Sequence, residues 1–166
     1  MTAMVVTLTN FFKDFRVVTT VARLTGTCFM LSATLALAHE EATGVVKERM
    51  DLMDRQKDDM KIIGNMAKGK TPFDAAKAAE AARDVAVTSE EIPKLFPEGS
   101  DGHPSEAKPE IWTKWDEFTG NADELHAVAQ ALAAALDGGS PDWKEDFKKV
   151  TDACKTCHKS FRQEKD

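Results

Sequence analysis

The stretch SPDWKEDFKKVTDACKTCHKSF, residues 140–161, predicts an amphipathic helix near the C-terminus of the chain. It opens with a serine cap, a first-turn proline and a first-turn acid at Ser140, Pro141 and Asp142, which is typical of a helix start. The side chains of its inner face recur at three- and four-residue spacing and are Trp143, Phe147, Val150, Cys154, Cys157, His158 and Phe161. A helix with one such face is expected to pack against other helices.

Two further helices are predicted in the first half of the chain. The segment 45–67 has apolar and long side chains at helical spacing with acids and lysines between them. Its inner stripe is Val46, Arg49, Met50, Met53, Met60, Ile63 and Ala67. The second helix is expected to start with Thr71 as N-cap and Pro72 in the first turn, and to run to about Val87.

A long connection and a third helix complete the pattern. Residues 88–108 contain prolines and glycines, which indicates a loop with a short turn around residues 92–96. The third helix is expected from Pro109 to Gly138. Its stripe is Ile111, Trp115, Phe118, Ala122, Leu125, Ala129, Leu132 and Leu136. No useful length of the chain after residue 38 alternates with period two, so we predict an all-α fold, an antiparallel four-helix bundle over residues 39–166.

The N-terminal 38 residues have the pattern of a secretory signal peptide. Three basic side chains and one acid in residues 1–23 precede an apolar stretch, residues 24–38, which ends in Ala36-Leu37-Ala38. As a helix, these 15 residues would span about 22 Å, short of the roughly 30 Å needed to cross a bilayer. We therefore expect cleavage after Ala38, export and no stable membrane insertion.

Charge and cysteine content narrow the function of the mature chain. The whole chain has 22 basic and 28 acidic side chains, and removal of residues 1–38 leaves a formal charge of −8. Such a surface disfavours nucleic acid as a partner. Cleavage also removes Cys28, so Cys154 and Cys157 remain. A disulfide between them would close a loop too small to staple the fold, so a structural role is a weak explanation.

The sequence CKTCH, residues 154–158, predicts covalent haem. Cys154, Cys157 and His158 project from one side of a helix because they are three and four residues apart. The spacing C-x-x-C-H is the attachment signature of c-type haem. Each thiol adds to one porphyrin vinyl group, and the neighbouring imidazole binds the iron. We therefore expect one haem c, held by Cys154 and Cys157, with His158 as proximal iron ligand.

Other uses of these residues are less consistent with the sequence. A zinc site needs four ligands, and the remaining histidines, His39, His103 and His126, are scattered. A thioredoxin-like dithiol usually follows a strand at a helix N-terminus, whereas this pair lies in the last turns of a helix. A chance match in a haem-free periplasmic helical scaffold stays open as an alternative.

Four features together resemble the cytochrome c′ family. They are CxxCH near the C-terminus, KGKTPFDAA at residues 68–76, KPEIW at residues 108–112, and Arg162 four residues after His158. The similarity covers about residues 45–165. It implies an exported bacterial haem protein, periplasmic in Gram-negative species, and often a homodimer through the first two helices.

The resemblance also points to the opposite face of the iron. In five-coordinate members an apolar residue of the first helix covers this face, and NO or CO can bind. In low-spin relatives a methionine of that helix is the sixth ligand, and the protein transfers electrons. Counting back from Lys68-Gly69, the matching position is Met53, with Met50 as the next candidate. Methionine also fills core gaps, so Met53 could simply pack there.

Three further residues complete the predicted site. The resemblance places Arg49 near a haem propionate and Arg162 beside the proximal histidine, although both are also compatible with solvated helix charges. His126 is a rival sixth ligand, but it flanks the stripe of the third helix and is expected to be partly exposed. The resulting prediction is a non-enzymatic electron carrier that exchanges electrons with redox partner proteins. A five-coordinate protein that binds NO or CO is the first alternative.

Overall fold

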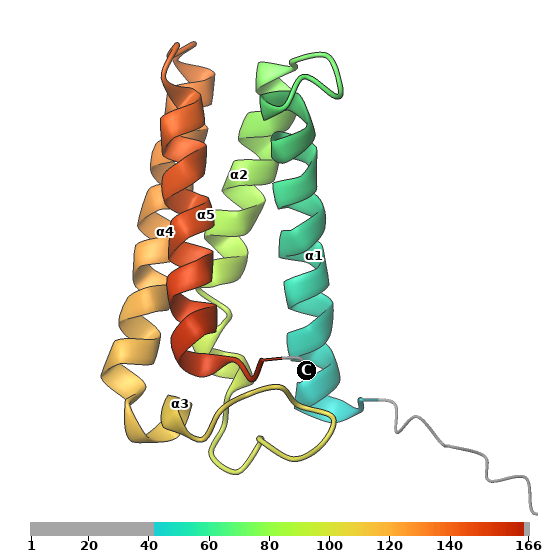
Figure 1. The fold of residues 1–166 in the computed structure, drawn as a ribbon, viewed down its shortest axis with the longest axis vertical. Coiled ribbons are helices and arrows are strands. Elements are labelled where there is room, and N and C mark those ends of the chain that lie inside the picture. Colours follow the sequence, from blue (N-terminus) through green and yellow to red (C-terminus); the bar gives the residue numbers. More distant parts are fainter. Residues whose placement is uncertain (1–41, 165–166) are drawn as a thin grey trace, which may run out of the picture. The chain divides into compact units, whose positions relative to one another are not determined.

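The computed structural model describes residues 42–164, and the predicted signal peptide, with Cys28, lies outside this range, as does His39. The helical elements are α1 (Gly44–Ala67), α2 (Ala75–Ser89), the 3₁₀ turn η1 (Pro93–Leu95), α3 (Glu110–Thr113), α4 (Trp115–Asp137) and α5 (Trp143–Phe161). The four long helices lie side by side and alternate in direction (Figure 1). The predicted antiparallel four-helix bundle is confirmed.

No strand occurs between residues 42 and 164, where β-pairing is limited to one isolated antiparallel bridge between Ala107 and Arg162. No helix in this range combines the length and the apolar character needed to span a bilayer. The short turn expected around residues 92–96 is confirmed as η1.

Helix α2 begins later than predicted, so the assignment of Thr71 as its N-cap is wrong. Asp74 is the cap: its backbone is extended, and its Oδ1 accepts a hydrogen bond from the Lys77 amide at 3.0 Å. The preceding Phe73 stacks on Trp143 with the ring centroids 5.0 Å apart. This contact directs Phe73 towards α5, next to the non-helical residues that precede Asp74.

The third predicted helix is divided in two. Lys114 has non-helical angles, φ −126° and ψ 45°, and separates α3 from α4. The indole N–H of Trp112 contacts the carbonyl oxygens of Phe96 and Pro97 at 3.0 and 3.1 Å, which ties α3 to the preceding loop. Trp115, predicted on the apolar stripe, is 37% exposed. The start predicted for the last helix at Ser140 is also early, because Asp142 is the residue before α5.

Small side chains bring α2 and α4 together. Both helices bury several alanines, and side chains of this size let helix backbones approach closely. The buried alanines are Ala78, Ala79, Ala81, Ala82, Ala86, Ala122, Ala129 and Ala133. Leu132 of α4, Val150 of α5 and Ile63 of α1 are fully buried in the same core. Of the long helices, α4 packs most closely, against α2 on one side and α5 on the other, and α1 joins the bundle chiefly through α2.

Helices α1 and α5 approach each other near the C-terminal end of α1 and the N-terminal end of α5. A Cβ placed on buried Gly64 would lie 3.5 Å from Cζ of Phe147, an ordinary van der Waals distance. Beyond this point α1 and α5 do not form an extensive backbone interface, in contrast to α1 with α2 and α4 with α5. Gly64 and Phe147 therefore lie opposite each other, which gives a reference point for the register between the two helices.

We expect Gly64→Ala to raise the free energy of unfolding by about 0.5–1 kcal/mol, because alanine favours the helix and its methyl group fits against Phe147. Gly64→Leu is expected to lower it by about 1–3 kcal/mol, because the larger side chain forces α1 away from α5. Urea unfolding of the haem-loaded protein measures both. Equal effects of the two substitutions would contradict the close contact.

Candidate haem site

The two cysteine thiols lie on the inner side of the last turns of α5. Cys154 and Cys157 are free, half-buried, and packed against the hydrophobic core. Burial raises the pKa of the Cys154 thiol. Burial and the neighbouring Cys154 raise the pKa of Cys157 to about 11. The pair is therefore protonated at neutral pH, and adjacent turns of one helix present both sulfur atoms together.

His158 follows the thiols and keeps access to solvent. The protein around its ring lowers its pKa by desolvation, the Arg162 cation lowers it further, and the Glu106 carboxylate opposes both. A lowered pKa keeps the imidazole neutral, which is the form that has a lone pair for a metal. The predicted proximal ligand thus has the required chemical state at neutral pH.

The proximity of Gly64 on α1 to Phe147 on α5 shows which residue of α1 lies opposite His158. Helices α1 and α5 run in opposite directions (Figure 1). His158 lies eleven residues after Phe147, and Met53 lies eleven residues before Gly64. Eleven residues are close to three full turns, about 16 Å along the helix axis. Met53 therefore shares the Gly64 face of α1, and it lies level with His158 on the facing helix.

The methionines of α1 differ in environment. Met53 and Met60 are partly buried and pack against the core, whereas Met50 is 48% exposed. Met50 is also one turn further from the level of His158. Of the two candidate ligands, Met53 is the one whose side chain is already turned towards the bundle interior.

Arg49 is buried and is engaged by the connection between η1 and α3. Its Nε and Nη2 donate to the Leu95 carbonyl at 3.1 and 2.8 Å, and its remaining N–H groups reach the Ser100 carbonyl and the hydroxyls of Ser100 and Ser105 at 2.7–3.2 Å. The guanidinium also stacks over Phe96 at 3.8 Å. All five donors are thus used, and the contact of Arg49 with a haem propionate stays a prediction.

The same connection also reaches the end of α5. Arg162 Nε donates to Glu106 Oε2 at 2.7 Å, and the Lys108 amide donates to the Phe161 carbonyl at 2.9 Å. Residues 106–108 therefore lie beside the residues that follow the CxxCH sequence. Sequence reasoning missed Glu106, which pairs with Arg162 and acts on His158 from a loop about fifty residues away. No local sequence pattern predicts a pairing between residues so far apart in the chain.

The rival histidines lie elsewhere. His126 is half-buried on α4, where its Nδ1 is 2.9 Å from the Ala86 carbonyl and 3.4 Å from Glu90 Oε1. The expected partial exposure is confirmed, and its contacts are with α2. His103 lies in the exposed loop before α3, as predicted.

The donor set fits a covalently attached haem. Two thiols and an imidazole occupy one side of α5, and a thioether lies at the same level on α1. Between Gly64 and the start of α1, the backbones of α1 and α5 do not form an extensive interface. These residues can supply two covalent bonds to a porphyrin and one or two bonds to its iron.

Comparison with known proteins decides the family. A sequence model described as Cytochrome C′ matches residues 44–162, the whole helical bundle from α1 to the end of α5. The chain belongs to the cytochrome c′ family. As a member of this family it is a c-type haem protein, with one haem c attached through Cys154 and Cys157.

Individual similar proteins agree with this assignment. Cytochrome c-554 of Cereibacter sphaeroides is 32% identical over 141 residues, which cover 81% of this chain and 92% of that protein. The structure of cytochrome c prime from Shewanella frigidimarina has a TM-score of 0.70 and 29% identity over 75% of this chain and 98% of its own. The nitric oxide complex of a variant of cytochrome c prime from Alcaligenes xylosoxidans has a TM-score of 0.67 and 27% identity, and covers 73% and 94%.

Proposed function

We propose that this cytochrome c′ is a periplasmic electron carrier, not an enzyme, in which His158 and Met53 bind the two faces of the haem iron. The observation that carries the proposal is the register between α1 and α5, which puts Met53 level with His158. When bound, the haem supplies a reversible one-electron Fe(III)/Fe(II) couple.

The side chains at this site have distinct roles in the proposal. The neutral imidazole of His158 would hold the iron through its lone pair, and the uncharged thioether of Met53 would favour the reduced state of the iron. Leu52, Met60 and Phe147 are partly buried and pack against the core on the same helices. A dry, apolar surrounding raises the reduction potential in the same direction.

A second candidate function is the binding of NO or CO at an open iron face. It is favoured by the fold similarity to a cytochrome c prime that is described as a nitric oxide complex. In this alternative Met53 packs over the ring without bonding to the iron. The haem-free scaffold is set aside, because the chain belongs to a family that carries covalent haem and retains both cysteines.

The partners proposed for the electron carrier are redox proteins of the same compartment. The resemblance also predicts a homodimer through α1 and α2. Val87, 59% exposed on α2, is a large apolar side chain available for such a contact.

Replacing Met53 with alanine tests the proposed ligation. The native oxidised protein is expected to show a low-spin absorption spectrum, and Met53→Ala is expected to convert it to high spin, because a strong-field sulfur ligand is lost. The variant should then bind CO in the reduced state. Met50→Ala is the matched control and should leave the spectrum unchanged. A native spectrum that is already high-spin and does not respond to Met53→Ala would favour the gas-binding alternative.

A further inference from the structure

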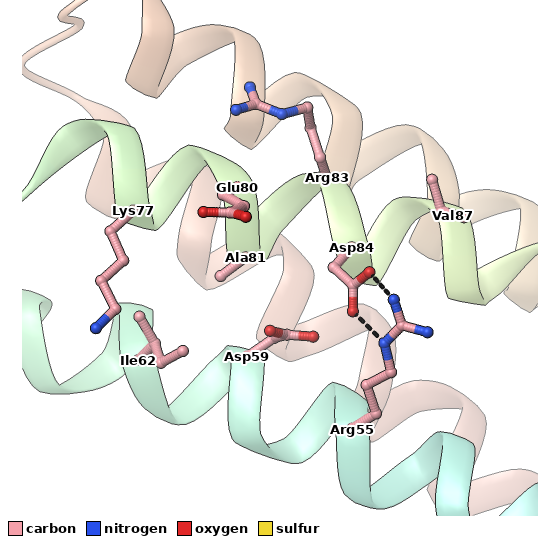
Figure 2. A pocket seen from close by; sticks show the side chains of 9 residues that line it. All are labelled: Arg55, Asp59, Ile62, Lys77, Glu80, Ala81, Arg83, Asp84 and Val87. Atoms are coloured by element: carbon pink, nitrogen blue, oxygen red, sulfur yellow. Dashed lines mark hydrogen bonds and ion pairs between the residues drawn. The ribbon is translucent and has the colours of Figure 1, made fainter.

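A group of charged side chains lies across the junction of α1 and α2, away from the haem residues. It borders a surface hollow of about 530 Å³ (Figure 2). Arg55 of α1 makes a bidentate ion pair with Asp84 of α2, in which Nε lies 2.5 Å from Oδ2. Asp59, one turn after Arg55, directs its carboxylate towards α2 beside this pair (Figure 2). The junction thus contains two carboxylates, Asp59 and Asp84, and Arg55 is paired with Asp84.

Asp59 is the member of this group that lacks a hydrogen-bond donor for one of its carboxylate oxygens. Its Oδ2 is buried and receives no hydrogen bond from the residues that the structure describes. A buried carboxylate oxygen without a donor is costly. Two ionised carboxylates are both acceptors, so Asp59 and Asp84 can bond to each other only when one of them holds a proton.

The pKa of Asp59 is raised and that of Asp84 is lowered, so Asp59 is the residue that holds the proton. Burial, a hydrogen bond with Asp84 and the charge of Asp84 raise the pKa of Asp59 to about 6, against the opposing effect of Arg55. Burial also acts to raise the pKa of Asp84, but hydrogen bonds from Arg55 and Asp59 outweigh it and hold that pKa below its usual value. Asp84 therefore stays ionised in the range where Asp59 titrates.

The other charges near the junction do not supply the missing donor. On α1, Asp58 adds a further negative charge that acts on Asp59. On α2, Lys77 and Glu80 line the hollow with opposite charges, and Arg83 is paired with Asp137 of α4 at 2.7 Å. Helix α5 contributes no residue to the hollow. Arg55 itself is committed to Asp84.

We propose that Asp59 and Asp84 form a proton-dependent latch between α1 and α2. With Asp59 protonated, its hydroxyl donates to the Asp84 carboxylate and joins the helices. With Asp59 ionised, two negative charges face each other in a partly buried site, and the contact is lost. Because α1 is attached to the bundle chiefly through α2, the latch sets how firmly the helix that carries Met53 is held. The latch itself does not depend on which ligand the iron has.

The sign of the pH effect follows from the raised pKa of Asp59. The folded protein holds this proton more tightly than the unfolded chain, so the contribution to stability is complete below about pH 4 and is lost as the pH rises through about 6. The difference of about two pH units corresponds to a fall of roughly a hundredfold in the folding equilibrium constant. Asp84 acts in the opposite direction, but only at pH values below the ordinary carboxyl range.

Urea unfolding of the haem-loaded protein between pH 4.5 and 7.5 tests the latch. Asp59→Asn keeps the shape of the side chain and carries an amide donor for Asp84 at every pH. This variant should lose most of the fall in stability seen in the native protein, while Asp123→Asn, on an exposed position of α4, should retain it. The comparison removes the contributions of the histidines, which all three proteins share.

A second measurement does not depend on any substitution. The carboxyl carbon of Asp59 in the native protein should titrate by NMR with a midpoint near 6. A midpoint near 4 for Asp59 would overturn the proposal. An unchanged pH dependence of stability in Asp59→Asn would also overturn it.

Discussion

Replacing Cys154 and Cys157 together with serine is expected to abolish covalent haem attachment completely. Each thiol supplies one thioether bond, and serine has the size but not the nucleophilic sulfur to form it. After maturation in a haem-ligating host, the denatured native protein should retain the tetrapyrrole mass, and the double variant should show the polypeptide mass alone. Each single variant keeps one thioether position and should retain haem at reduced yield.

Cys28→Ser provides the matched control for this experiment. Cys28 lies in the predicted signal peptide, so its replacement should leave the haem content of the mature protein unchanged. The control also separates an effect on attachment from a general effect of losing a cysteine. Retention of covalent haem by the double variant would contradict the assignment of these two residues.

Replacing Arg49 with leucine is expected to lower the free energy of unfolding by about 3 kcal/mol, or the melting temperature by roughly 10 °C. The substitution removes five hydrogen bonds and the stacking on Phe96, and it leaves the carbonyls of Leu95 and Ser100 without their donors. Arg49→Lys should recover only part of the loss, because an ammonium group cannot reproduce the planar fork of donors. Thermal unfolding followed by circular dichroism measures both variants.

Arg83→Leu is the control for removal of an arginine with an ion pair. Its partner Asp137 and Arg83 itself are both more than half exposed, so the expected loss is below about 1 kcal/mol. Similar losses for Arg83→Leu and Arg49→Leu would contradict the role of Arg49 as the anchor of the connection between η1 and α3.

Local sequence patterns were sufficient for the architecture and the attachment residues. Apolar spacing predicted α1 to within one residue at its start, and the CxxCH spacing placed both thiols and the imidazole on one side of α5. These features depend on residues close together in the chain, where helix geometry alone determines the relation between side chains.

Features that depend on tertiary contacts were beyond the same reasoning. Helix α2 is capped by Asp74 instead of the predicted Thr71, and this later start coincides with the stacking of Phe73 on Trp143, seventy positions away. The five bonds of Arg49 and the pairing of Glu106 with Arg162 also join distant segments. Asp59 has an unremarkable place in the sequence, and its burial beside Asp84 of α2 arises only from the packing of the two helices.

Two faces of α1 thus have different roles. Met53 lies on the face directed at α5, whereas Arg55 and Asp59 lie on the face directed at α2. Rotation of α1 would therefore affect both. The packing of Phe147 beside Gly64 limits such rotation near the C-terminal end of α1.

A crystal structure of the oxidised, haem-loaded protein tests the central claim most directly. We predict a porphyrin bonded to the sulfur atoms of Cys154 and Cys157, with His158 and the Met53 sulfur at bonding distance on opposite faces of the iron. An iron bound by His158 alone, with Met53 merely in van der Waals contact with the ring, would contradict the proposed electron carrier with two protein ligands.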